Sequence, residues 1–175
     1  MKTFKRILSA LLILIIIVFL CGFFLVRHIS NRAVPDYNAG ITLQGLKNPV
    51  DVFRDEYGIP HVYAQTEEDL YRVVGYMMAQ DRLWQMDLIR RVTSGRLSEI
   101  FGEDYLGADK LFRALRVPAK SMMVMENTDP VVLKQIEAFS DGVNQYIEKN
   151  QKKLPFEFAV LGYKPDTWEP IHTYN

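Results

Sequence analysis

Cysteine is almost absent from this chain of 175 residues, since Cys21 is the only one and lies inside an uncharged apolar run. A single cysteine excludes an intrachain disulfide and any metal site built from paired cysteines. Histidine is also scarce, with three residues, and no acidic loop of the EF-hand type is present. We therefore expect this chain to contribute no metal ligands.

Neither sign of charge is in excess over the whole chain, which has 21 basic and 21 acidic residues. The charges are nevertheless unevenly placed, because residues 1–32 contain five basic residues and no acidic one. Residues 33–175 are left with 16 basic and 21 acidic residues, a net charge of −5. A mildly acidic body does not suit a polyanion, so we expect no nucleic-acid partner.

The longest apolar segment is Ile7 to Val26, which has no charged residue and follows a basic end at residues 1–6. At 1.5 Å per residue, about twenty helical residues span about 30 Å, the thickness of a bilayer's hydrocarbon core. The sequence predicts a single-pass signal anchor at 7–26 in contact with membrane lipid, with residues 1–6 in the cytoplasm and the body on the extracytoplasmic side of the cell membrane. A cleaved signal peptide and a secreted body are the alternative, although no convincing small-x-small cleavage site is present.

Residues 27–49 contain turn-forming residues without helical periodicity, which predicts a linker. Within it, Gly40 to Leu46 is a candidate strand. After the linker, two short alternating runs at Val50 to Val52 and Val62 to Ala64 flank the turn-forming sequence DEYG. This pattern predicts a β-hairpin.

Two long helices are predicted after the hairpin. Thr66 is expected to cap the first helix, with Asp69 as its capping-box partner, and the apolar periodicity continues to about Val92. Gly75 inside this helix costs about 1 kcal/mol relative to Ala, so we expect it to admit another backbone or a large side chain closely. The second helix begins with Asp129 as N-cap and Pro130 in the first turn.

Shorter elements are predicted between these helices. Leu97 to Phe101 is expected to form a short helix that stops at Gly102, and Gly95 is a plausible C-cap of the preceding helix. Residues 103–128 are ambiguous, although Ala108 to Leu115 has helical composition.

Taken together, Val50 to Pro170 resembles the N-terminal part of the penicillin acylase (penicillin amidase) family. The resemblance rests on RDEYGIPH in the hairpin, GYMMAQDRLWQM in the helix and RRVTSGRLSE after it, in this order. An ordered set of segments is much more specific than one short motif. It implies an N-terminal-nucleophile hydrolase with an αββα sandwich, of which residues 50–175 would form a partial, helix-rich α+β region with a β-hairpin, preceded by one transmembrane helix.

The resemblance also implies a reaction, the hydrolysis of linear amides such as those of acylated β-lactam antibiotics. A new N-terminal serine of the processed precursor would attack, with its own α-amino group as base. That nucleophile is expected beyond Asn175, in a C-terminal beta-chain region that would be the partner of this chain, so no catalytic residue is assigned. Calcium is implied only for the full-length enzyme. An N-acyl homoserine lactone acylase of the same fold and a non-catalytic membrane-anchored relic are the alternatives.

Tyr76 is the one candidate for substrate binding, because the resemblance places its helix near the acyl pocket. His61 and Asp55 could suggest a catalytic triad, but no serine lies in a G-x-S-x-G motif, so a structural histidine is the favoured interpretation. Other charged residues are interpreted as ion pairs that fix geometry rather than as acid and base. These pairs are Asp81–Arg82, Arg54–Asp55 and Arg96–Glu99.

Overall fold

The computed structural model describes the backbone of residues 2–32 and 34–175, and the side chains of residues 4, 6, 7, 11–27 and 34–175. The chain divides into two compact units, Met1–Asp36 and Tyr37–Asn175. Each unit has its own internal organisation, and they are described separately.

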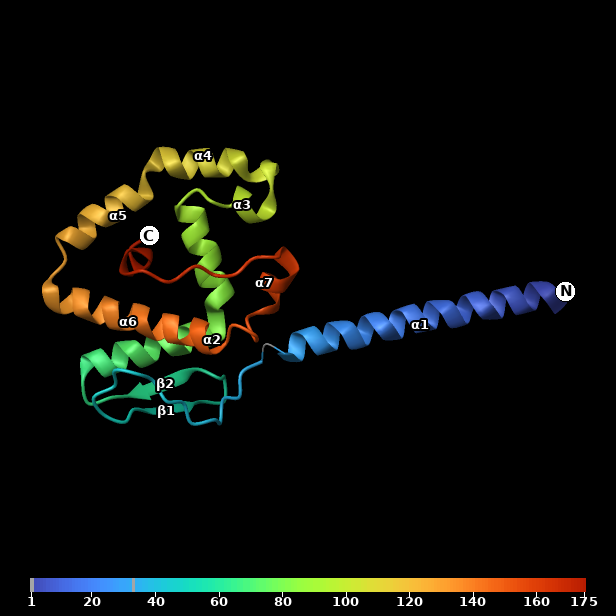
Figure 1. Ribbon diagram of the computed structural model, residues 1–175, viewed down its shortest axis with the longest axis horizontal. Helices are drawn as coiled ribbons and strands as arrows, with labels where there is room; N and C mark the ends of the chain where they lie inside the picture. Colours follow the sequence, from blue (N-terminus) through green and yellow to red (C-terminus); the bar gives the residue numbers. More distant parts are fainter. Residues whose placement is uncertain (1, 33) are drawn as a thin grey trace. The chain divides into compact units, whose positions relative to one another are not determined.

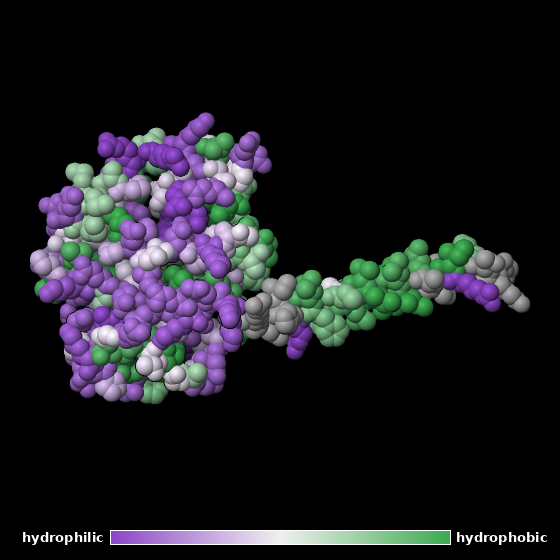
Figure 2. All heavy atoms as spheres, in the orientation of Figure 1, coloured by the Kyte–Doolittle hydropathy of each residue, from purple (hydrophilic) through white to green (hydrophobic). Residues whose placement is uncertain are grey.

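The first unit is one helix, α1 (Lys2–Arg32), which continues into the segment predicted as linker. Hydrophobic residues cover most of its coloured length in Figure 2. Cys21 is exposed on this helix. The segment predicted to span a membrane, 7–26, includes residues 8–10, whose side chains lie outside the described ones. Among the residues that are described, no helix combines the length and apolar character needed to cross a membrane.

The second unit begins with irregular chain and a hairpin. Strands β1 (Asp51–Arg54) and β2 (Pro60–Tyr63) pair antiparallel, with Val52 opposite Val62, which confirms the predicted hairpin. Both valines pack against the core, whereas the alternate residues of each strand are exposed. Gly40 to Leu46 forms turns and irregular chain rather than the strand considered from the sequence.

Helix α2 (Glu67–Thr93) begins as predicted, since the Thr66 side chain accepts a hydrogen bond from the Asp69 amide. The predicted capping box is wrong in its second half. The buried Asp69 carboxylate accepts hydrogen bonds from the backbone amides of Lys47 and Asn48 instead of returning to Thr66. The helix is kinked at Arg82, whose φ of −141° and ψ of 21° are not helical.

Helix α6 (Pro130–Lys149) packs directly against α2, and Figure 1 shows the two helices next to each other. Asp129 caps α6 as predicted by accepting from the Val131 amide. Two glycines allow the contact. A Cβ on Gly75 would lie 2.1 Å from a backbone oxygen of α6, and one on Gly142 would lie 1.9 Å from a backbone oxygen of α2. The close approach predicted for Gly75 is thus confirmed.

The remaining elements are short, and Figure 1 shows α4 and α5 following one another in an arch. The sequence predicted α3 and most of α4 but not α5, which follows α4 after a left-handed residue, Arg116, with φ of 55°. These elements are α3 (Ser98–Phe101), η1 (Glu103–Tyr105), α4 (Leu106–Leu115), α5 (Val117–Glu126), α7 (Phe156–Leu161) and η2 (Pro170–Thr173).

The hydrophobic core lies between α2, α6 and the hairpin, and the C-terminal segment closes it with Phe158 and Trp168. Leu83 and Val143 are among its most deeply buried side chains, at 1% and 0% exposed. The second unit is therefore a helix-rich α+β structure with one two-stranded antiparallel hairpin among its described residues. This confirms the helix-rich α+β region with a β-hairpin, whereas the wider αββα sandwich and the transmembrane helix of the predicted fold class stay predictions.

Candidate functional site

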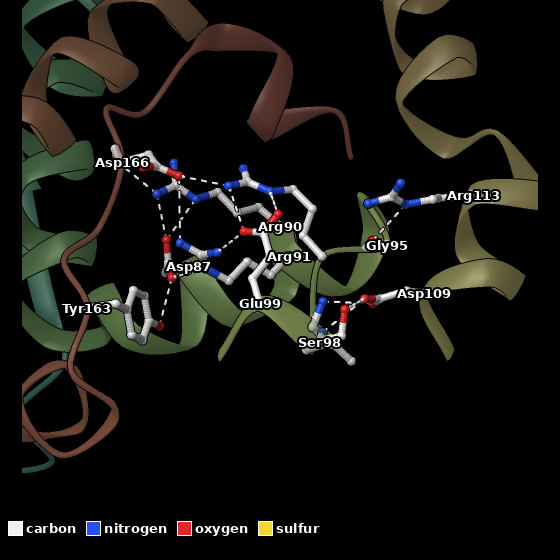
Figure 3. A network of polar contacts seen from close by, with 12 residues as sticks. Asp87, Arg90, Arg91, Gly95, Ser98, Glu99, Asp109, Arg113, Tyr163 and Asp166 are labelled. Carbon is white, nitrogen blue, oxygen red and sulfur yellow. Dashed lines mark hydrogen bonds and ion pairs between the residues drawn. The ribbon is translucent and has the colours of Figure 1, made fainter. Parts of the chain in front are cut away.

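Asp87 is the centre of a buried polar network on α2 (Figure 3). Its Oδ1 accepts from Arg90 Nε at 2.9 Å and Nη2 at 2.5 Å, and its Oδ2 accepts from Arg91 Nε at 2.9 Å. The Tyr163 hydroxyl also donates to Oδ2 at 2.8 Å. Burial, together with the Asp87 carboxylate beside it, raises the pKa of Tyr163 well above its ordinary value.

The two arginines carry the network beyond Asp87. Arg90 donates to the backbone oxygens of Asp166 and Thr167 at 2.8 and 3.1 Å, and Arg91 donates to Glu99 at 2.9 Å. The network therefore ties the C-terminal segment and α3 to one face of α2. Since several donors already occupy the Asp87 carboxylate, its geometry suits it to positioning these segments rather than to abstracting a proton.

A second buried carboxylate, Asp109 of α4, holds the start of α3 (Figure 3). It accepts from the amides of Leu97 and Ser98 at 2.7 and 2.9 Å and from the Ser98 hydroxyl at 2.5 Å. Burial alone would raise the pKa of Asp109, but the hydrogen bonds from Ser98 and Leu97 outweigh it and leave the pKa below its ordinary value. Asp109 is therefore ionised at neutral pH, and its hydrogen bonds hold the backbone at the start of α3.

Asp81 does not pair with Arg82, contrary to the sequence-based prediction. Its two oxygens accept from Arg54 Nη1 and Nη2 at 2.9 and 3.0 Å, while Arg82 donates to Gln85 at 2.8 Å. Consecutive residues of a helix point in different directions, so they do not face each other. The Arg54–Asp81 ion pair still has a structural role, because it joins the hairpin to α2.

The predicted pair of Arg54 with Asp55 is also wrong, because the Arg54 guanidinium pairs with Asp81. Asp55 instead accepts from the turn amides of Tyr57 and Ile59 at 3.0 and 2.9 Å, and lies 3.2 Å from His61 Nε2. The Ile59 amide and then His61 lower the pKa of Asp55. The third predicted pair, Arg96–Glu99, is confirmed at 2.9 Å.

The Asp55–His61 contact does not form a catalytic triad with the hydroxyl of Ser98, Ser121 or Ser140. These hydroxyls donate elsewhere, Ser98 to Asp109, Ser121 to the Tyr174 oxygen and Ser140 to the Ile136 oxygen. Among the described residues, no three acidic, histidine or cysteine side chains gather as metal ligands either. None of the three serine hydroxyls therefore donates to His61, as a triad would require.

Tyr76, the candidate substrate residue, lies in the core and is 5% exposed. Its ring packs edge-on against Tyr146 at 5.4 Å between centroids. Burial raises the pKa of Tyr76 and, with a smaller effect of Tyr76 itself, raises the pKa of Tyr146 to about 12. Tyr76 also lines a cavity of about 470 Å³ between α2, β1 and residues 37–46, so a role in ligand binding stays a prediction.

A second hollow, of about 540 Å³, lies between the hairpin turn and the kinked part of α2. Tyr37 and Arg54 line both hollows, and the Arg54 guanidinium lies 4.2 Å from the centre of the Tyr37 ring. The cation–aromatic contact thus stands at the boundary between them.

The network around Asp87 was not predicted from the sequence. A local signal for part of it is present, because Asp87 precedes Arg90 and Arg91 by three and four residues, the spacing at which helix side chains meet. Tyr163 could not be found in this way, because it lies 76 residues away.

Comparison with known proteins gives matches over most of the second unit. The sequence model of the family described as penicillin amidase matches residues 49–175. Penicillin acylase 2 proenzyme of Pseudomonas sp. (strain SE83) is 37% identical over 147 residues, which cover 84% of this chain and 19% of that protein. Penicillin G acylase of Escherichia coli is 35% identical over 126 residues, 70% of this chain and 15% of that protein.

Other matches extend the range of relatives. Acyl-homoserine lactone acylase QuiP of Pseudomonas fluorescens (strain Pf0-1) is 34% identical over 141 residues, 81% of this chain and 17% of that protein. A solved structure, the thermostable penicillin G acylase from Alcaligenes faecalis, is similar with a TM-score of 0.64 and 30% identity, covering 71% of this chain and 68% of that chain. The chain thus spans less than a fifth of the length of these curated relatives.

Proposed function

Because the chain belongs to the penicillin amidase family, we propose that it forms the N-terminal part of an acylase-like amidohydrolase, which hydrolyses the linear amide C–N bonds of acylated substrates. The observation that carries the proposal is the match over residues 49–175. This span includes the hairpin, α2 and α6, the elements that enclose the core. It would be the part of an αββα sandwich that contributes a hairpin and an outer helical region.

Two substrate classes fit the relatives, the side-chain amide of a β-lactam antibiotic and the amide of an N-acyl homoserine lactone. The relatives include both penicillin acylases and an acyl-homoserine lactone acylase. We propose the β-lactam amide as the substrate and keep the N-acyl homoserine lactone as the alternative. A non-catalytic, membrane-anchored relic is the alternative outside enzymology.

Catalysis would be divided between this region and further polypeptide. The buried carboxylates of Asp87 and Asp109 already accept several hydrogen bonds each, so this region would supply geometry rather than the reacting groups. The nucleophile would come from a beta-chain region corresponding to the rest of the relatives, one of which is described as a proenzyme. Any calcium ion would likewise belong to the full-length enzyme.

The location we propose is the cell membrane, with the body on the extracytoplasmic side. The support is the charge-free sequence of residues 7–26 after a basic end. If the segment is an uncleaved anchor, the chain stays in the membrane fraction after an alkaline carbonate wash. A soluble form that begins between Gly22 and Ala39 would show a cleaved signal peptide instead.

An activity assay of the chain by itself tests the division of catalysis. We expect no hydrolysis of phenylacetyl, phenoxyacetyl or long-chain acyl amides above background, because the proposal places the nucleophile elsewhere. His61→Ala is the matched variant. Turnover that survives purification and disappears in His61→Ala would favour a local histidine mechanism and contradict the proposal.

A further inference from the structure

The α4–α5 segment, residues 106–125, carries a charge opposite to that of the rest of its unit. It contains four basic residues and one acidic residue, a net charge of +3, whereas residues 33–175 as a whole have a net charge of −5. The acidic residue is Asp109, which is buried. The basic residues are all exposed, and they are Lys110, Arg113, Arg116 and Lys120. The exposed charge of this segment is therefore positive.

The inner side of the α4–α5 segment is held by the rest of the unit. Asp109 accepts from two backbone amides at the start of α3, and the buried Ser121 donates its hydroxyl to the Tyr174 oxygen at 3.1 Å. The Tyr174 hydroxyl in turn donates to Thr128 at 2.9 Å, just after α5. Both helices are thus fixed with their opposite sides turned away from the unit, along the arch of Figure 1.

Large apolar side chains of the segment are exposed to solvent. Leu111 and Leu115, which are four residues apart on one side of α4, are 57% and 46% exposed. Met122 and Met123 of α5 are 42% and 65% exposed. Figure 2 shows hydrophobic and hydrophilic side chains side by side along the upper edge of the second unit, where Figure 1 places α4. Exposed apolar side chains that gather in this way are typical of a surface that binds a protein or a membrane.

Three cations beside these apolar side chains have no counter-charge among the described residues. The ion pairs of this part of the chain do not include Lys110, Arg116 or Lys120. The fourth cation, Arg113, lowers the pKa of the buried Asp109 by its charge, so these two charges offset each other. A lysine stem can lie along an apolar surface while its ammonium reaches a polar layer. The segment therefore offers apolar contact and unpaired positive charge together.

We propose that the outer side of α4 and α5 binds the surface of an anionic lipid bilayer, with its apolar side chains among the headgroups and its cations beside the lipid phosphates. Basic residues next to exposed leucine are typical of helices that lie in a membrane interface, and each Lys or Arg strengthens binding to an anionic surface on the order of fivefold. A protein partner suits the surface less well, because protein interfaces are depleted in lysine. This contact is additional to the proposed anchor at residues 7–26, and neither requires the other.

The test is methyl NMR of the full chain, with isotope-labelled methionine, in nanodiscs that carry a gadolinium chelate on some headgroups and so broaden nearby signals. One set of nanodiscs contains phosphatidylglycerol and phosphatidylcholine in equal parts, and the other contains phosphatidylcholine alone. The Met122 and Met123 signals should lose at least about half of their intensity in the anionic set relative to the neutral set, because only the anionic surface attracts the cations. Met78 of α2 is the control, since it is 44% exposed against 42% for Met122, and its signal should be equal in both sets.

Two results would overturn the proposal. The first is equal intensity of the Met122 and Met123 signals in both sets, which is the result expected if another polypeptide covers the surface. The second is a loss for Met78 as large as that for Met123. Recovery of the chain with phosphatidylcholine nanodiscs reports the anchor by itself, so the two membrane proposals can fail separately.

Charge reversal locates the contact on the molecule. Lys110→Glu combined with Lys120→Glu should weaken docking at least about twentyfold and so abolish the lipid-dependent loss of signal. Lys152→Glu combined with Lys153→Glu is the matched control, because it changes the net charge equally at exposed residues of the turn after α6, and it should leave the loss in place. Salt at about 1 M, where the Debye length is about 3 Å, should also restore the signals. A loss that persists in the first variant, or disappears equally in both, would contradict the proposal.

Discussion

Gly75 of α2 lies against the backbone oxygen of Phe139 in α6, and a Cβ at this glycine would stand only 2.1 Å from that oxygen. A backbone oxygen cannot move aside as the end of a flexible side chain can. A larger residue at position 75 must therefore push the two helices apart. Because α2 and α6 enclose the core, this contact determines how closely the main layers of the second unit pack.

Gly75→Ala should therefore destabilise the chain, by about 1 to 3 kcal/mol on the usual scale for overpacking. Gly107→Ala is the matched control, because Gly107 lies in α4 with no atom near its would-be Cβ. That control should be neutral or stabilising by less than about 1 kcal/mol, from helix propensity alone. Urea unfolding followed by circular dichroism measures both, and equal stability of the two variants would contradict the contact.

Asp87→Asn should lower the free energy of unfolding by about 3 to 5 kcal/mol, because it leaves two buried arginines without their shared counter-charge. Asp166→Asn is the control, since the Asp166 side chain is 55% exposed and its ion pairs are long, 3.4 Å to Arg96 and 3.6 Å to Arg91. Its effect should stay below about 1 kcal/mol. If both variants unfold at the same urea concentration, Asp87 is not the anchor of the network.

His172 predicts a pH dependence of stability. Its Nδ1 accepts from the Glu169 amide at 2.9 Å, and burial followed by the Arg90 cation lowers the pKa of the ring below 6.5. The unfolded chain thus binds the proton more tightly, so this contribution to stability is complete above pH 6.5 and is lost as the pH falls through the folded pKa. His172→Asn should reduce the decline in unfolding free energy between pH 7.5 and 5. An unchanged slope in His172→Asn would oppose the assignment.

A double-mutant cycle can verify the true partner of Asp81. Arg54→Met and Asp81→Asn should show a coupling energy of about 1 kcal/mol, since the pair is bidentate and its side chains are 16% and 24% exposed. The cycle of Asp81→Asn with Arg82→Met should give a value near zero, because Arg82 contacts Gln85 instead. Larger coupling in the second cycle would restore the pairing expected from the sequence.

Local patterns predicted the local structure well. The alternation around Val52 and Val62 gave the hairpin, and Asp129 and the glycine at position 75 gave the start of α6 and a close helix contact. In each case one or two neighbouring residues carry the physical cause, such as a cap or the absence of a side chain.

Partners distant in the sequence were not predictable in the same way. Asp81 was assigned to its neighbour, whereas Arg54 reaches it from 27 residues away, and Tyr163 reaches Asp87 across 76 residues. Such contacts depend on how the hairpin and the C-terminal segment dock on α2, which periodicity does not encode. The strand expected at Gly40 to Leu46 was wrong for the same reason, since Gln44 and Gly45 are held by side chains from α6 and α2 rather than by pairing as a strand.

The most direct test of the central claim is the rate of penicillin G hydrolysis by a chimera. In this chimera, residues of this chain that match penicillin G acylase of Escherichia coli replace the corresponding segment of that protein. If this chain supplies the N-terminal part of an acylase, the chimera should be processed and should hydrolyse penicillin G, while the 175-residue chain alone does not. A folded chimera without hydrolysis, or hydrolysis by the chain alone, would contradict the account.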